Sequence, residues 1–88
     1  MQQYIYPAVF FKEDDKYTVA FPDLNLFTDG DTLIETFLFA KSYLKEFLKY
    51  SIRYEMDIEK PTALEKLKNR FADEIIMFVD AVVDEQLV

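Results

Sequence analysis

Two stretches rich in aromatic and β-branched residues, separated by a pair of aspartates, constrain the fold of this chain more than any other feature. Residues 4–13 and 16–21 consist largely of residue types that favour a pleated surface. Asp14-Asp15 between them is a candidate two-residue turn, because Asp tolerates the left-handed backbone conformations of tight hairpins. The pattern therefore predicts an antiparallel hairpin.

The expected register determines which side chains share a face of this hairpin. A turn at Asp14-Asp15 sets the facing pairs as Lys12 with Tyr17, Phe10 with Val19, and Ala8 with Phe21. One face then carries Tyr4, Tyr6, Ala8, Phe10, Tyr17, Val19 and Phe21, and the other carries Ile5, Val9, Phe11, Thr18 and Ala20. Both faces are largely apolar. We therefore expect one face to pack against a helix of the chain and the other to be covered by something else.

After the hairpin, the sequence predicts a turn, a short third strand and a long helix. Pro22-Asp23-Leu24-Asn25 is typical of a turn, and residues 26–28 can form the strand. Thr32 followed by Glu35 is a capping box, which marks a helix start. The helix should end near Tyr54, because the segment beyond it is polar and closes on a proline. Its apolar side comprises Leu33, Phe37, Ala40, Leu44, Phe47 and Leu48.

The last third of the chain predicts a short helix and one segment that fits two structures. Thr62 can cap a helix over residues 62–70, with Glu65 in the reciprocal position. Residues 74–83 alternate as a strand does, although the same run fits a buried helix turn; we favour the strand. The expected fold class is α+β, one domain over residues 1–88 in the order β-β-β-α-α-β. Its three- to four-stranded, antiparallel-rich sheet would carry one long and one short helix.

Charge and missing residue types limit the possible functions. Ten Lys and Arg against seventeen Asp and Glu give a net charge of −7, which repels nucleic-acid phosphates and favours a basic protein as partner. The absence of Cys and His excludes disulfides, thiol nucleophiles and the usual zinc ligands. Six Tyr and nine Phe are too many for one small core, so we expect exposed rings and a homodimer or higher oligomer. No segment predicts membrane insertion, and we expect a cytoplasmic protein.

Clustered charges offer a chemical interpretation beside a structural one. Asp23, Asp29 and Asp31 lie before the long helix, where carboxylates could hold Mg²⁺ for nuclease chemistry. Acidic residues there also complement the helix dipole, and we favour that interpretation. The stripe of Lys41, Lys45 and Lys49 is interpreted as a solvated face rather than a phosphate-binding one. We therefore expect no catalytic residue, no metal and no cofactor.

Three sequence segments in a fixed order resemble one known family, the HicB-like antitoxins. They are Tyr6-Pro7-Ala8-Val9-Phe10, then Tyr17-Thr18-Val19-Ala20-Phe21-Pro22-Asp23-Leu24, then Gly30-Asp31-Thr32 with Glu35 and Ala40. The resemblance covers residues 4–54 and, more loosely, residues 74–84. Two features depart from the family pattern. Asn25-Leu26 stands where many relatives carry Pro-Gly-Cys, and the chain shows no helix-turn-helix or ribbon-helix-helix element after residue 84, so we do not expect direct DNA binding.

The resemblance implies a fold, a loss of catalysis and a partner. The fold would be a degraded ribonuclease-H-like one, and the partner a HicA toxin, a small basic ribonuclease whose active surface the antitoxin covers. The acidic charge of this chain suits that partner independently. As contact residues we expect Phe27, Asp29, Asp31 and Glu35, on grounds of exposure and charge. A residual Mg²⁺-dependent nuclease and an orphan self-associating domain remain the alternatives.

Overall fold

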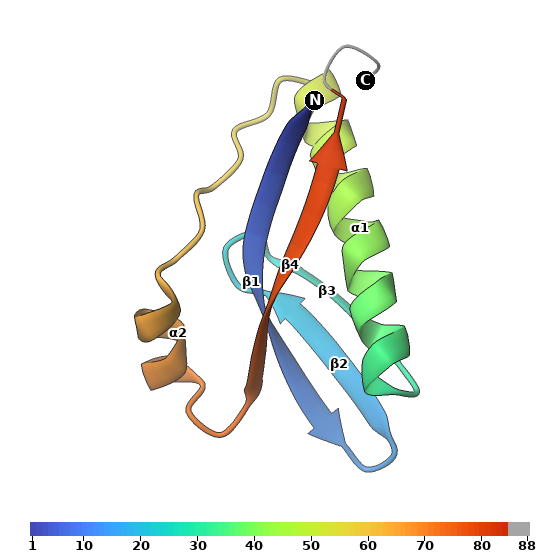
Figure 1. Ribbon diagram of the computed structural model, residues 1–88, viewed down its shortest axis with the longest axis vertical. Coiled ribbons are helices and arrows are strands. Elements are labelled where there is room, and N and C mark those ends of the chain that lie inside the picture. Colours follow the sequence, from blue (N-terminus) through green and yellow to red (C-terminus); the bar gives the residue numbers. More distant parts are fainter. Residues whose placement is uncertain (85–88) are drawn as a thin grey trace.

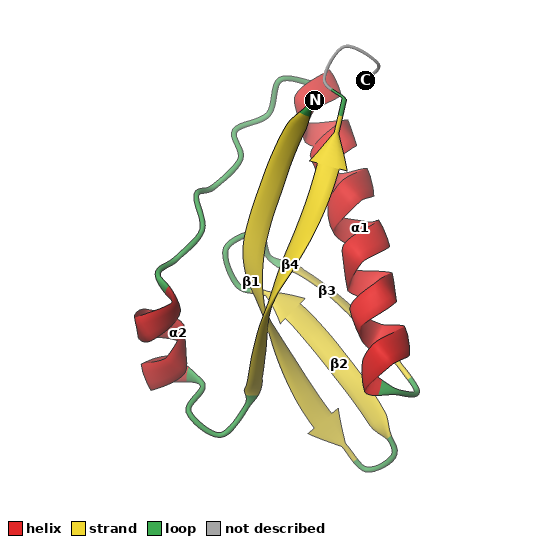
Figure 2. Ribbon diagram, viewed as in Figure 1, coloured by secondary structure: helices red, strands yellow, loops and turns green. Residues whose placement is uncertain are grey.

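The computed structural model describes residues 1–84, and within them the elements follow the predicted order (Figure 1). They are β1 (Gln2–Glu13), β2 (Lys16–Phe21), β3 (Leu26–Gly30), α1 (Leu33–Arg53), α2 (Leu64–Arg70) and β4 (Ile75–Val83). The α+β class and the strand at the end of the chain are thereby confirmed (Figure 2). The third strand extends through Asp29 and Gly30, two residues further than predicted.

The four strands of residues 1–84 form one antiparallel sheet in the order β3-β2-β1-β4. The pairs Lys12–Tyr17 and Phe10–Val19 are confirmed, and Asp14 adopts the expected left-handed conformation with φ 53°. The β1–β2 ladder ends at Val9–Ala20. The register is therefore the expected one, and the expected pair of Ala8 with Phe21 lies one position beyond the end of this ladder.

The core lies between α1 and one face of the sheet. Its buried hydrophobic residues are Tyr6, Ala8, Phe10, Val19, Phe21, Leu24, Ala40, Leu44, Leu48, Val79, Ala81 and Val83. Leu33, Phe37 and Phe47 of α1 pack against this cluster, so the predicted apolar side of the helix is confirmed. Phe10 and Phe37 stack with ring centroids 6.4 Å apart across the interface. We call this side of the sheet the inner face and the other side the outer face.

The outer face is covered only in part, by α2, which lies on the side of the sheet opposite α1 (Figure 1). Phe71, at the end of α2, meets Phe11 of β1 edge to face at 5.8 Å. Val9 and Leu67 are buried on this side. Ile5 and Phe78 remain about half exposed, so the prediction that some large apolar side chains lie outside is confirmed.

The start of α1 is fixed by its cap and by a close approach to β3. Thr32 is the N-cap, and its Oγ1 accepts a hydrogen bond from the Glu35 backbone N–H at 3.0 Å, as predicted. A Cβ at Gly30 would lie 2.5 Å from Thr36 Oγ1, so only glycine lets the helix begin so close to the strand. The helix ends at Arg53 with Tyr54 as C-cap, in agreement with the prediction.

The predicted start of the second helix is wrong. The helix α2 begins at Leu64, and its N-cap is Ala63, which makes no side-chain capping bond. The Thr62 hydroxyl is bonded to Asp23 Oδ1, and the Thr62 N–H donates to Asp23 Oδ2 at 2.9 Å. Thr62 therefore anchors the α1–α2 connection to the β2–β3 turn instead of capping the helix.

Candidate partner-binding surface

Strand β3 forms one edge of the sheet and presents an aromatic ring and a carboxylate on the outer face. Because Thr28 pairs with buried Val19, the neighbouring residues Phe27 and Asp29 point to the opposite side. Phe27 is 69% exposed, an unusual position for a phenylalanine, and Asp29 is exposed as well. An edge strand with an exposed ring and a charge is a common recognition element.

Two adjoining hollows extend from Phe27 to the β1–β2 turn and share Thr18 and Asp29. The first, of about 400 Å³, is lined by Thr18, Phe27, Thr28 and Asp29. The second, of about 360 Å³, is lined by Glu13, Asp14, Asp15, Lys16, Thr18 and Asp29. We refer to both together as the acidic groove.

The acidic groove gathers four carboxylates around a single lysine. Pairing of Glu13 with Lys16 and of Thr18 with Asp29 brings the turn and the edge strand together. The sequence prediction treated Asp14 and Asp15 only as turn residues. The alternation along residues 26–30 could have placed Asp29 beside them, had the third strand been predicted at its full length. The excess of negative charge attracts a basic surface and repels a phosphate backbone.

The four predicted contact residues divide between two sides of the sheet. Phe27 and Asp29 belong to the acidic groove, as described above. Asp31 lies in the bend before α1, and Glu35 lies in the first turn of that helix, on the inner side. Asp31 and Glu35 therefore are not part of the groove, and their acidity complements the positive end of the helix dipole.

The carboxylates proposed as a Mg²⁺ site do not form one. Both oxygens of Asp23 accept hydrogen bonds from Thr62, which occupies them structurally. Among residues 1–84, no group of three or more Asp, Glu, His or Cys side chains is arranged to hold a metal ion. Nearby, the buried Tyr6 hydroxyl donates to the Glu59 carbonyl at 2.6 Å, and the pKa of Tyr6 is raised by burial and by the charges of Asp23 and Glu59.

The lysine stripe of α1 is not uniformly solvated. Lys41 Nζ donates to Asp80 Oδ1 at 2.8 Å and to the Asp80 carbonyl at 3.2 Å, which ties α1 to β4. The hydrogen bond and charge of Lys41 hold the pKa of Asp80 below its ordinary value. Lys49 lies 3.7 Å from Glu46 on the same helix. Lys45 is exposed, in agreement with the solvated interpretation.

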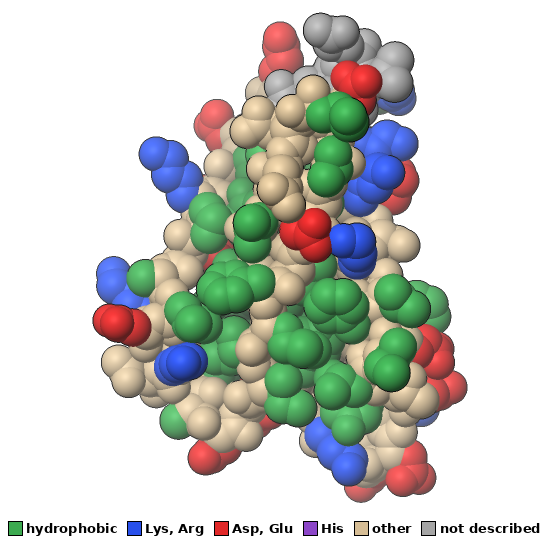
Figure 3. Space-filling view, viewed as in Figure 1, with side chains coloured by type: hydrophobic (Ala, Val, Ile, Leu, Met, Phe, Trp, Pro, Cys, Tyr) green, Lys and Arg blue, Asp and Glu red, His purple; other side chains and the backbone are tan. Residues whose placement is uncertain are grey.

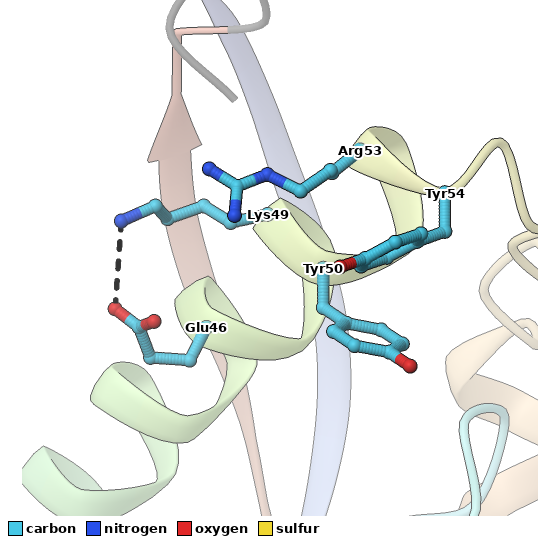
Figure 4. Close-up of a pocket in the computed structure, with 5 residues that line it drawn as sticks. All are labelled: Glu46, Lys49, Tyr50, Arg53 and Tyr54. Atoms are coloured by element: carbon cyan, nitrogen blue, oxygen red, sulfur yellow. Dashed lines mark ion pairs between the residues drawn. The ribbon is translucent and has the colours of Figure 1, made fainter.

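A further hollow of about 350 Å³ lies along the last turns of α1 (Figure 4). It is lined by Glu46, Lys49, Tyr50 and Arg53 of α1 and by Tyr54, the C-cap of the same helix. The rings of Tyr50 and Tyr54 contact each other at 4.7 Å. A hollow formed by consecutive turns of a single helix has no opposing wall, so we do not assign a ligand to it.

No protein-family model and no curated protein matches the sequence, but solved structures match the fold. The antitoxin HicB of Burkholderia pseudomallei gives a TM-score of 0.76 over 91% of this chain, at 22% identity. A chain of a toxin–antitoxin complex from Streptococcus pneumoniae gives 0.80 over 98%, at 20% identity. A chain of a HicA3 and HicB3 toxin–antitoxin complex gives 0.71 over 91%, also at 20% identity.

These matches confirm at the level of the fold the resemblance that the sequence motifs indicate. This chain has the fold of HicB antitoxin, with a four-stranded antiparallel sheet in its described residues. It spans 62% of the Burkholderia protein, 72% of the Streptococcus chain and 100% of the third chain. No helix within residues 1–84 is long and apolar enough to cross a membrane.

Proposed function

We propose that this chain is a non-enzymatic antitoxin that binds a small, basic, HicA-type toxin ribonuclease and masks its active surface. The observation that carries the proposal is the acidic groove beside exposed Phe27, on a fold shared with HicB antitoxin. Two of the matched chains come from toxin–antitoxin complexes, which supports a toxin as the partner. A ribonuclease needs a basic surface to hold RNA, and that surface is what an acidic groove complements.

Phe27 and the carboxylates of the groove would have different roles in such a complex. An exposed ring that is buried on binding contributes affinity, because it removes apolar area from water. The carboxylates Glu13, Asp14, Asp15 and Asp29 would steer the encounter and exclude acidic proteins. The exposed ring and the charges lie together on the β1–β2 hairpin and its neighbouring strand β3.

Charge reversal in the groove tests this assignment. In Asp15→Lys/Asp29→Lys, the rate of association with a candidate HicA-type toxin should fall by about tenfold or more. The matched control is Asp57→Lys/Glu59→Lys, which makes the same charge change on two exposed residues of the α1–α2 connection. Stopped-flow or surface-plasmon measurements give the rates. Equal loss of rate in both double variants would show that only net charge matters, and would remove the groove from the proposal.

A further inference from the structure

Strand β4 forms the other edge of the sheet, and its first half is exposed and apolar. It pairs with β1 on one side, and no strand of residues 1–84 pairs with its other side. Ile75 is 43% exposed and Phe78 is 54% exposed, and Ile34 and Leu38 of α1 are more than half exposed. An apolar hollow of about 260 Å³ beside the strand is lined by Leu33, Ile34, Phe37 and Met77. Figure 3 shows hydrophobic side chains gathered over this region, between the two helices.

Two independent contacts fix which backbone groups of β4 face outward. Pro7 lies opposite Phe78 and has no N–H to donate, so this pair is a non-hydrogen-bonded one and the Phe78 backbone groups point away from β1. The Asp80 carbonyl accepts from Lys41, and it therefore also points outward. Outward groups alternate along a strand, so the outward hydrogen-bonding positions of β4 are residues 76, 78, 80 and 82.

Lys41 closes this edge at Asp80. Its Nζ binds both the outward carbonyl and the side chain of Asp80, which is how natural sheets protect an edge from pairing. Only Ile76 and Phe78 then remain available for new backbone hydrogen bonds in the strand before the Lys41 contact. The available edge is short, apolar and has Met77 at its centre.

We propose that a second copy of this chain pairs with β4 in antiparallel fashion, with Met77 on the two-fold axis. Ile76 of each copy then forms a hydrogen-bonded pair with Phe78 of the other, so the exposed ring packs on a β-branched side chain across the strands. The two Met77 side chains meet beside the apolar hollow. The resulting sheet is continuous across both copies, and the two-fold symmetry makes the contact close on itself.

Charge favours a second copy over a basic partner at this edge. The chain has a net charge of −7, but residues 75–78 carry no charge, and Lys41 and Asp80 at the end of this edge neutralise each other. A basic protein would find one further carboxylate here, Glu74, against the four of the acidic groove. In the proposed register, Glu74 of one copy lies opposite Asp80 of the other. The Lys41 that binds this Asp80 then offsets the repulsion between the two carboxylates.

Cysteine scanning tests the register, because the chain contains no cysteine of its own. In Met77→Cys, the two cysteines form a non-hydrogen-bonded pair. Their Cα atoms lie about 4.5 Å apart, which is within the range that a disulfide can bridge. In the control Ile75→Cys, the same pairing places the two Cα atoms about 13 Å apart, too far for a disulfide. Mild oxidation should convert Met77→Cys to a covalent dimer and leave Ile75→Cys without a covalent cross-link, although Ile75 is the more exposed residue.

Sedimentation equilibrium tests the association without any cysteine. The unmodified chain should show twice the 10.5 kDa mass of one copy as concentration rises from about 1 µM to about 1 mM. Phe78→Lys should remain monomeric and folded by circular dichroism, since this side chain is half exposed. A monomer over the whole range for the unmodified chain, equal cross-linking of both cysteine variants, or a dimer in which Met77→Cys fails to cross-link would each overturn the proposal.

Discussion

At the scale of single residues, Asp23 shows how a carboxylate in a loop can hold two distant segments together. It receives two hydrogen bonds from Thr62, a residue 39 positions away in the sequence. The same connection is held by the bond from Tyr6 to Glu59. These contacts fix the path by which the chain passes from α1 on the inner face to α2 on the outer one.

Loss of this anchor should destabilise the fold. Asp23→Ala removes charge-assisted bonds and leaves the Thr62 N–H without its partner, which should lower the free energy of unfolding by roughly 1–3 kcal/mol. Urea denaturation followed by circular dichroism gives this value. The control Asp57→Ala changes an exposed carboxylate in the same connection and should unfold close to the unmodified chain. Coincident unfolding curves for both variants would show that the anchor is not stabilising.

Sequence patterns could not predict these residue-scale contacts. Thr62 followed by Glu65 matches a capping box, and Lys41 continues a regular lysine stripe. In the structure each of them binds a partner 39 positions away, Asp23 and Asp80 respectively. Local spacing carries no information about such partners. By contrast, Thr32 was predicted correctly because its partner, the Glu35 N–H, is three residues away.

At the scale of elements, the Lys41–Asp80 ion pair couples α1 to β4 and gives the stability a specific pH dependence. The pKa of Asp80 is lowered from its ordinary value of 3.8 by the Lys41 hydrogen bond and charge. The folded state therefore holds the Asp80 proton less tightly than the unfolded chain does. The stabilisation is present above pH 3.8 and is lost as pH falls through the lowered pKa.

Asp80→Asn should reveal this dependence. Its midpoint of urea denaturation should lie slightly below that of the unmodified chain at about pH 7, and the difference should be smaller at a pH well below 3.8, where Asp80 begins to take up its proton. The effect should be small because both side chains are partly exposed to solvent. Asp73→Asn, at an exposed site outside the ion pairs of residues 1–84, should show no difference at either pH. A difference of the same size at the lower pH would assign the effect to packing instead of charge.

The elements themselves were largely predictable because their signals are local. Composition rich in aromatic and β-branched residues predicted β1 and β2, and alternation predicted β4. The apolar spacing with a cap predicted α1 from its first turn to its last. The start of α2 and the length of β3 were not predicted. Both are set by tertiary contacts, those of Thr62 with Asp23 and those of β3 with β2.

At the scale of the whole molecule, the two proposed surfaces lie on opposite edges of the sheet. The acidic groove adjoins β3, and the self-pairing surface lies along β4, with β2 and β1 between them. Pairing through β4 would therefore leave both grooves of a dimer open. The two proposals together imply an assembly of two copies of this chain with two toxin molecules.

The sequence predicted a basic partner from net charge alone, but it could not place the carboxylates of the proposed binding surface. Charge counts do not say where carboxylates gather, and two of the four predicted contact residues lie outside the groove. The placement depends on the β1–β2 turn, which brings Asp14 and Asp15 alongside Asp29 of the edge strand.

The most direct test of the central claim is a titration of RNA cleavage by a candidate HicA-type toxin. With purified toxin and a labelled RNA, cleavage should fall in proportion to added chain and cease near equimolar amounts, because each groove masks one active surface. The inhibition should weaken as salt rises, since the attraction between the charged surfaces is screened. Undiminished cleavage at a large excess of folded chain would contradict the account.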